Sequence, residues 1–266
     1  MKNLKLKNKI SVCIDMMFAS HDFFDRFEAV KKSGMNVIEF WRWTVKDVDA
    51  IIKKLDELNM KVSIFSMDSS DEKLSNDLLR GILNTGRVEE FIYALKESIP
   101  VYKKLNAKAM IVLIGDETKA FPIEEQKENI YKCLKAAAPI VEANNVTLIV
   151  EPLNSFDRIG YSMPYVTPVF EIIERVDCPN IKILYDIYHQ NMMGDFDIDE
   201  IRKNIKRIGH FHVADAPGRH EPGTGKVDYV SILNEILKMD YDGYIGLEYR
   251  ATKYDGDTFG FLDDLN

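Results

Sequence analysis

The sequence predicts a single α/β domain in which eight strands alternate with helices and close into a (β/α)8 barrel, the TIM-barrel fold. Three observations support this fold class. Short β-branched apolar runs recur along the chain, segments with helical periodicity separate them, and four of the later runs end in a carboxylate or an imidazole. Parallel strands buried on both faces give continuous apolar runs of this kind. A doubly wound open sheet is the alternative, but no glycine-rich nucleotide-binding motif follows the first strand.

The first half of the chain sets this alternation. The run Ile-Ser-Val-Cys-Ile-Asp at residues 10–15 predicts a strand, and apolar residues at helical spacing then predict a helix at 23–33, which Gly34 ends. The same patterns continue as strand 36–43, helix 47–59, strand 61–67, polar loop 68–73, helix 88–105, strand 107–115, helix 123–143 and strand 146–151.

The second half repeats the pattern with longer loops. A long loop at 152–168 is followed by helix 169–176, strand 181–186, short helix 197–204, strand 207–214, the Pro- and Gly-rich segment 215–226, helix 228–239 and strand 244–250. The tail at 258–265 is expected to form a partial helix. No repeat or linker divides the chain, so residues 1–266 are predicted to form one domain.

Composition limits the classes of function. A chain of 266 residues with 46% hydrophobic residues can bury the core of one large barrel. The net charge of −8 argues against a nucleic-acid partner, because phosphate binding requires a basic face. No run of about 18 uncharged apolar residues predicts a membrane span. Cys13, Cys133 and Cys178 form no disulfide or zinc pattern, and the N-terminus lacks a true signal peptide, so we expect a cytoplasmic protein.

Four side chains at predicted strand ends form the candidate site. Glu151, Asp186, His212 and Glu248 should converge, because the carboxyl ends of barrel strands meet at one mouth. Three carboxylates alone would raise one another's pKa, whereas one divalent cation would leave a net charge of about −1 and allow one carboxylate to act as a base. The donor set suits Mn²⁺, Mg²⁺ or Co²⁺, with Zn²⁺ as an open alternative. For each acid, the alternative role is to cap the helix that follows.

Other polar and aromatic residues are expected around this cluster. His189 follows the sixth strand and is placed to donate a hydrogen bond to a substrate hydroxyl; the alternative is an exposed loop histidine. Arg219 lies in a Pro- and Gly-rich segment that we expect to turn the guanidinium inward. Trp41 is expected either to wall the pocket or to pack on helices. Glu39 is expected to point into the barrel, and His210 to lie deeper as a supporting or core group.

Two motifs carry a family resemblance. Glu151-Pro-Leu-Asn154, followed by Asp157 and Gly160-Tyr161, and the segment Gly218-Arg-His-Glu-Pro-Gly-Thr-Gly225 resemble the hydroxypyruvate isomerase family. That family is one of the sugar phosphate isomerase/epimerase-like barrels, which include D-tagatose 3-epimerase and, more distantly, endonuclease IV. The resemblance spans nearly the whole chain, from Met16-Met17-Phe18 to Glu248.

The resemblance implies roles for the candidate residues. Glu151 and Glu248 would be metal ligands and the acid/base pair, with Asp186 and His212 as further ligands. His189 and Arg219 would contact the substrate, and Asp157 occupies the position of an acid with a less defined role. Hydroxypyruvate isomerases often have glutamine where this chain has His212, so the histidine favours a ketose epimerase or sugar isomerase. The group also implies a homodimer or homotetramer.

The predicted function is therefore metal-dependent isomerisation or epimerisation of small unphosphorylated sugars. One glutamate would remove a carbon-bound proton to give an enediolate, and the other would return a proton. Three alternatives remain at this point: hydroxypyruvate isomerase proper, an endonuclease IV-like metal-dependent phosphodiesterase, and a non-enzymatic sugar-binding barrel. The phosphodiesterase would need three metal ions and more ligands than a chain with five histidines readily offers.

Overall fold

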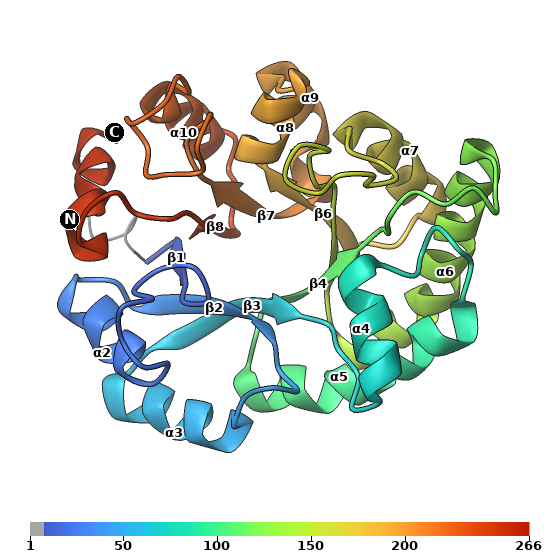
Figure 1. Ribbon diagram of the computed structural model, residues 1–266, viewed down its shortest axis with the longest axis horizontal. Helices are drawn as coiled ribbons and strands as arrows, with labels where there is room; N and C mark the ends of the chain where they lie inside the picture. Colours follow the sequence, from blue (N-terminus) through green and yellow to red (C-terminus); the bar gives the residue numbers. More distant parts are fainter. Residues whose placement is uncertain (1–7, 266) are drawn as a thin grey trace.

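The computed structural model describes residues 8–265, which form a closed barrel of eight parallel strands in chain order, with β8 pairing back to β1. Figure 1 shows the strands at the centre and the helices around them. The predicted (β/α)8 barrel is confirmed. The strands are β1 (Ile10–Cys13), β2 (Val37–Arg42), β3 (Lys61–Ser66), β4 (Ala109–Leu113), β5 (Leu148–Glu151), β6 (Ile181–Asp186), β7 (Ile208–Val213) and β8 (Tyr244–Leu247).

Helices cover the outside of the barrel. The α-helices are α2 (Asp25–Lys32), α3 (Val48–Leu58), α4 (Glu72–Arg80), α5 (Val88–Leu105), α6 (Ile123–Asn144), α7 (Val166–Val176), α8 (Ile187–Met193), α9 (Ile198–Asn204) and α10 (Tyr229–Lys238). Two 3₁₀ segments, η1 (Ile205–Arg207) and η2 (Asp255–Asp264), complete the described chain. In residues 8–265, no helix is both long and apolar enough to cross a bilayer.

Four of the helix-to-strand turns begin with the same backbone conformation. Helices α3, α5, α6 and α7 are each followed by a residue in the left-handed conformation: Asn59 (φ 49°), Asn106 (φ 49°), Asn145 (φ 52°) and Asp177 (φ 50°). Asn and Asp tolerate this conformation better than other residues with a side chain, and it turns the chain out of the helix. The next strand begins within four residues in each case.

Two helices depart from the sequence prediction. No helix was predicted at α4, although Asp71 caps it by accepting a hydrogen bond from the N–H of Leu74. A loop was predicted where α8 begins, directly after β6. The correction matters for His189, which lies in α8 with 1% of its surface exposed and is therefore not an exposed loop histidine. The eighth strand also ends earlier than predicted, at Leu247.

The inside of the barrel has an apolar side and a polar side. A small apolar cluster, separate from the large core between strands and helices, comes from β3 to β6: Ile64, Ala109, Ile111, Ile149 and Leu184. On the side of β1, β2, β3 and β7, buried polar residues face one another inside the barrel, and they include Ser11, Glu39, Ser63 and His210. The predicted inward direction of Glu39 is confirmed. Hydrogen bonds join Ser11 to Ser63, Ser63 to Glu39 and Glu39 to His210, so this side of the barrel is a hydrogen-bonded network.

Candidate active site

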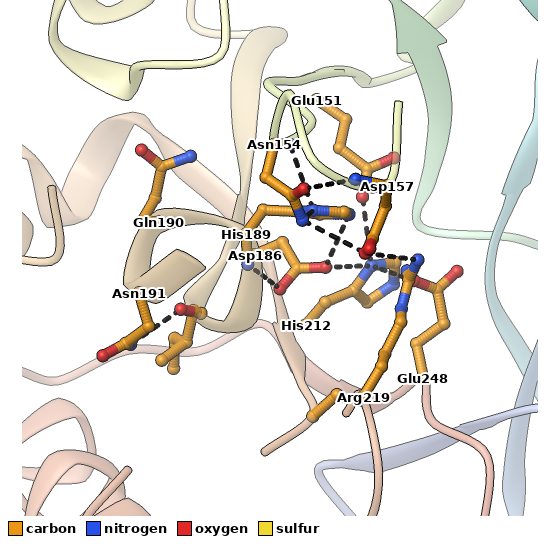
Figure 2. A network of polar contacts seen from close by, with 12 residues as sticks. Glu151, Asn154, Asp157, Asp186, His189, Gln190, Asn191, His212, Arg219 and Glu248 are labelled. Atoms are coloured by element: carbon orange, nitrogen blue, oxygen red, sulfur yellow. Dashed lines mark hydrogen bonds and ion pairs between the residues drawn. The ribbon is translucent and has the colours of Figure 1, made fainter. Parts of the chain in front are cut away.

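The four predicted strand-end residues lie together at the carboxyl ends of β5 to β8. Glu151 and Asp186 are the last residues of β5 and β6, His212 is near the end of β7, and Glu248 directly follows β8. One potential ligand atom from each lies within 4.8 Å of those of the other three. Figure 2 shows the four side chains pointing toward one another.

The imidazole of His212 turns its Nδ1 atom toward the acids. Nδ1 is 3.3 Å from Oε1 of Glu151, 3.5 Å from Oε2 of Glu248 and 3.9 Å from Oδ2 of Asp186. Its other nitrogen, Nε2, points away from this group and lies 2.9 Å from Oε1 of Glu39. The two nitrogens therefore have separate environments, one within the acid cluster and one below it.

The electrostatics of the cluster fit a divalent cation. The three acids are buried, with 6% or less of each residue exposed. Burial raises the pKa of Glu151, and the charges of Glu248 and Asp186 raise it further, against the opposing effect of His212. Burial acts to lower the pKa of His212, but the surrounding acids, Glu248 foremost, raise it well above its ordinary value. A cation shared by three carboxylates and Nδ1 would compensate this excess of negative charge, and oxygen-rich sets of this kind bind hard or borderline divalent metals.

Asp186 does two things at once. Its Oδ1 atom accepts a hydrogen bond of 3.1 Å from the N–H of His189 and so caps α8, while Oδ2 faces the cluster. The capping role that was the alternative for a strand-end acid therefore holds for Asp186 together with its place in the cluster. The cap also fixes the start of α8, which carries His189 to the mouth.

His189 is held as a neutral hydrogen-bond donor. Its Nδ1 accepts a hydrogen bond of 3.1 Å from the backbone N–H of Asn154, so the proton resides on Nε2. Burial, and after it the charge of Arg219, lower the pKa of His189 to about 3, which keeps the ring uncharged. Nε2 is buried, lacks a hydrogen-bond partner and lies 3.4 Å from Oδ2 of Asp186. Its N–H is available to a ligand at the mouth.

The loop after β7 brings Arg219 over the cluster. A bridge between Asp215 and His220 closes the loop, and Arg219 adopts φ 57° at its tip, next to Gly218 at φ 111°. The guanidinium contacts Glu248 and lies 3.8 Å from Oδ2 of Asp157. Figure 2 shows Arg219 between these two acids.

Trp41 reaches the same glutamate from β2. Its indole Nε1 donates a hydrogen bond of 2.9 Å to Oε1 of Glu248, and the residue is 39% exposed. Trp41 lines the pocket rather than packing beneath helices. Trp43, by contrast, donates through Nε1 to Ser98 on α5 and so packs away from the mouth.

A pocket of about 560 Å³ opens above the cluster, lined by Glu151, His189, Arg219, Glu248 and Trp41 among other residues. Four cationic side chains line it, and each has a carboxylate partner: Arg42 with Asp68, Lys46 with Asp15, Arg158 with Asp116, and Arg219 with Glu248. This volume is in the range of small-ligand sites.

Sequence reasoning assigned no role to several residues that shape the site. Asn154 orients His189, and the hydroxyl of Tyr161 joins the N–H of Ile114 (2.8 Å) to the carbonyl of Glu151 (2.7 Å). Both belong to the motif after β5, so a signal was present. Tyr188 lies with its ring 5.3 Å from the Arg219 guanidinium and carried no signal, because its position depends on the unpredicted helix α8.

Known proteins resemble the chain over nearly its whole length. Hydroxypyruvate isomerase of Escherichia coli K12 is 29% identical over 243 residues, which cover 91% of this chain and 93% of that protein. A 2-oxo-tetronate isomerase of Cupriavidus necator is 28% identical over 242 residues, which cover 89% of this chain and 90% of the relative.

Solved structures share the fold. The AP endonuclease, family 2, of Brucella melitensis superposes with a TM-score of 0.87 at 24% identity, covering 96% of this chain and 98% of its own. D-psicose 3-epimerase of Clostridium cellulolyticum H10 gives 0.71 at 18% identity, covering 97% and 91%. The IolI protein, solved with a bound zinc atom, gives 0.71 at 17% identity, covering 96% and 94%. Residues 27–264 match the model of the xylose isomerase-like TIM barrel family, and the chain belongs to that family.

Proposed function

We propose that the protein is a metal-dependent isomerase or epimerase of small unphosphorylated sugars that acts by proton transfer through an enediolate. The observation that carries the proposal is the placement of two buried glutamates, Glu151 and Glu248, in one four-donor cluster beneath a pocket. The predicted isomerase class is confirmed by relatives that are named as isomerases. The individual residue roles and the metal are our proposal.

Glu151, Asp186, His212 and Glu248 would hold one divalent cation, which supplies a Lewis acid to polarise a substrate carbonyl when bound. Mn²⁺, Mg²⁺ or Co²⁺ is our expectation for this set, with Zn²⁺ as the alternative. Three of these four residues are buried carboxylates that lie close together, and a bound cation would compensate their negative charge. This supports the proposal.

The two glutamates are unequal, which suits an acid/base pair. Burial raises the pKa of Glu151, which makes this carboxylate a better proton acceptor than an exposed one. Glu248 instead accepts hydrogen bonds from Arg219 and Trp41. In the proposed reaction, one glutamate removes the carbon-bound proton and the other delivers a proton. Return to the same carbon from the opposite face epimerises the sugar, and return to the neighbouring carbon interconverts aldose and ketose.

The residues above the cluster would bind the sugar. His189 offers an Nε2–H to a hydroxyl, Arg219 and Asp157 offer a donor and an acceptor at the mouth, and Trp41 forms a wall. All four cationic side chains of the pocket already have carboxylate partners, so none is left to neutralise a phosphate dianion. This pairing supports an unphosphorylated substrate.

The test is a panel of ketoses, aldoses, four-carbon sugars and hydroxypyruvate, incubated with Mn²⁺ in D₂O and read by deuterium incorporation. We expect incorporation at the carbon next to the carbonyl for at least one sugar, and its loss in Glu151→Gln with the fold intact. Retained exchange in that variant would refute the assignment of Glu151.

Hydroxypyruvate isomerase proper is the second candidate, because the Escherichia coli protein of that name aligns with this chain over 93% of its own length. The same panel separates it: turnover of hydroxypyruvate with no exchange into longer sugars would favour it over the sugar epimerase. Cleavage of abasic DNA instead would support the phosphodiesterase alternative. A homodimer or homotetramer and a cytoplasmic location remain predictions, and light scattering on the purified protein tests the first.

A further inference from the structure

We propose that Glu39 is a positioning residue that holds His212 with its proton on Nε2, so that Nδ1 presents a bare lone pair to the metal cluster. The inference rests on the proposed function, because it assumes that the cluster binds a divalent cation. Glu39 lies on β2, and its hydrogen bonds and ion pairs go to Ser63, His210 and His212 rather than to the three acids of the cluster. It would act only through the ring of His212.

The contacts of Glu39 are those of an acceptor of two ring N–H groups. Oε1 lies 2.9 Å from Nε2 of His212, and Oε2 lies 3.0 Å from Nε2 of His210. Within residues 8–265, neither Oε1 of Glu39 nor Nε2 of His212 makes a hydrogen bond, although both atoms are buried and lie 2.9 Å apart. Each is therefore the other's available partner. An ionised carboxylate only accepts, so a histidine nitrogen beside it must carry the proton.

Gly246 on β8 has no side chain, and this leaves room for the Glu39 carboxylate beside the histidines. A Cβ atom on Gly246 would lie 2.6 Å from both carboxylate oxygens of Glu39 and 2.6 Å from Nε2 of His210. Gly246 pairs with His212 in the β7–β8 register, so the space opens directly beside the proposed ligand. The hydroxyl of Ser63 donates to Oε2 of Glu39 at 3.2 Å and holds the carboxylate from the third side.

The arrangement divides the two nitrogens of His212 between two tasks. A neutral imidazole carries one proton, and a metal requires the nitrogen that lacks it. Nδ1 faces the three acids, whereas Nε2 faces Glu39. By accepting a hydrogen bond from the Nε2–H group, Glu39 would select the tautomer, fix the ring plane and increase the basicity of Nδ1. Loss of such a partner typically costs 10- to 100-fold in metal affinity.

Glutamine at position 39 is a specific test because it keeps the shape and removes one acceptor. Two ring nitrogens face the side chain, and an amide presents one oxygen and one NH₂ to them. One histidine must then change its tautomer or lose its bond. The matched control is Glu97→Gln, the same chemical change on α5, where the carboxylate binds Ser69 and Ser70 far from the barrel interior.

The experiment measures Mn²⁺ affinity by calorimetry and the His212 tautomer by ¹⁵N NMR on histidine-labelled, Zn²⁺-loaded protein. We expect Glu39→Gln to bind Mn²⁺ at least about 10-fold more weakly than wild type, and Glu97→Gln to bind like wild type. Wild type should show the His212 proton on Nε2, with that signal lost or mixed in Glu39→Gln. Gly246→Ala, which crowds the carboxylate without removing its charge, should also weaken binding.

The outcomes separate this inference from the proposed function. Wild-type Mn²⁺ affinity and an unchanged His212 tautomer in a folded Glu39→Gln or Gly246→Ala variant would overturn the role of Glu39 while leaving the metal site in place. If wild type itself binds neither Mn²⁺ nor Zn²⁺, the proposed metal centre is wrong and the role of Glu39 is wrong with it.

Discussion

The hydroxyl of Tyr161 ties the loop after β5 to the strand that carries Glu151, and Tyr161→Phe isolates its contribution. The hydroxyl accepts from the N–H of Ile114 at 2.8 Å and donates to the carbonyl of Glu151 at 2.7 Å, and the residue is only 4% exposed. Removing it leaves a buried donor and a buried acceptor without partners, each at a cost of about 1–3 kcal/mol. We expect the free energy of unfolding to fall by about 2–4 kcal/mol.

This loss is measurable by urea denaturation and by calorimetry of the metal-free protein. For a chain of 266 residues, an unfolding entropy of about 2.1 cal/mol/K per residue converts the loss into a Tm decrease of about 4–7 °C. Tyr165→Phe is the matched control: Tyr165 is 46% exposed, and the same atom is removed where water can replace it, so we expect a change below about 0.5 kcal/mol. A Tyr161→Phe loss no larger than that of the control would refute the reasoning.

Three further predictions concern the site. Arg219→Ala should lower kcat/KM by about 10- to 100-fold while Mn²⁺ affinity, read by calorimetry, changes less, because the guanidinium contacts Glu248 and the pocket but is no metal donor. Mn²⁺ affinity should rise with pH by up to about tenfold per pH unit, because the metal must displace a proton from His212. The surrounding acids raise the pKa of His212, so this dependence should extend above pH 6.5. An affinity that stays constant from pH 5 to 8 would contradict the prediction. Treatment with EDTA should abolish solvent-deuterium exchange, and one equivalent of Mn²⁺ should restore it. Full exchange in the presence of the chelator would refute the metal dependence of the reaction.

The strands and the four clustered residues were predictable because each depends on local sequence. A β-branched run that ends in a charged group marks both a buried strand and its carboxyl end, and the closed barrel then brings those ends together. Helix α4 was missed although Asp71 caps it, because its few apolar residues are diluted by polar ones. Helix α8 was missed because it begins directly after the last residue of β6, with no turn residues between strand and helix to mark its start.

The finer contacts depend on alignment across the barrel, which one strand cannot reveal. Glu39 was expected to point inward, but its position below His212 depends on the stagger of β2 against β7. Likewise, Gly246 appears in the sequence as an ordinary strand glycine, and only the register of β8 beside β7 shows that it makes room for Glu39 and His210. The ion pairs of the pocket join residues from different loops, so they could not be predicted from any one segment of the sequence either.

Anomalous diffraction from crystals soaked in Mn²⁺ tests the central claim most directly. The account predicts one peak per chain, coordinated by Glu151, Asp186, Nδ1 of His212 and Glu248, with Nε2 of His212 still within hydrogen-bond distance of Glu39. No peak at this cluster, or three metal ions of the kind that a phosphodiesterase centre requires, would contradict it.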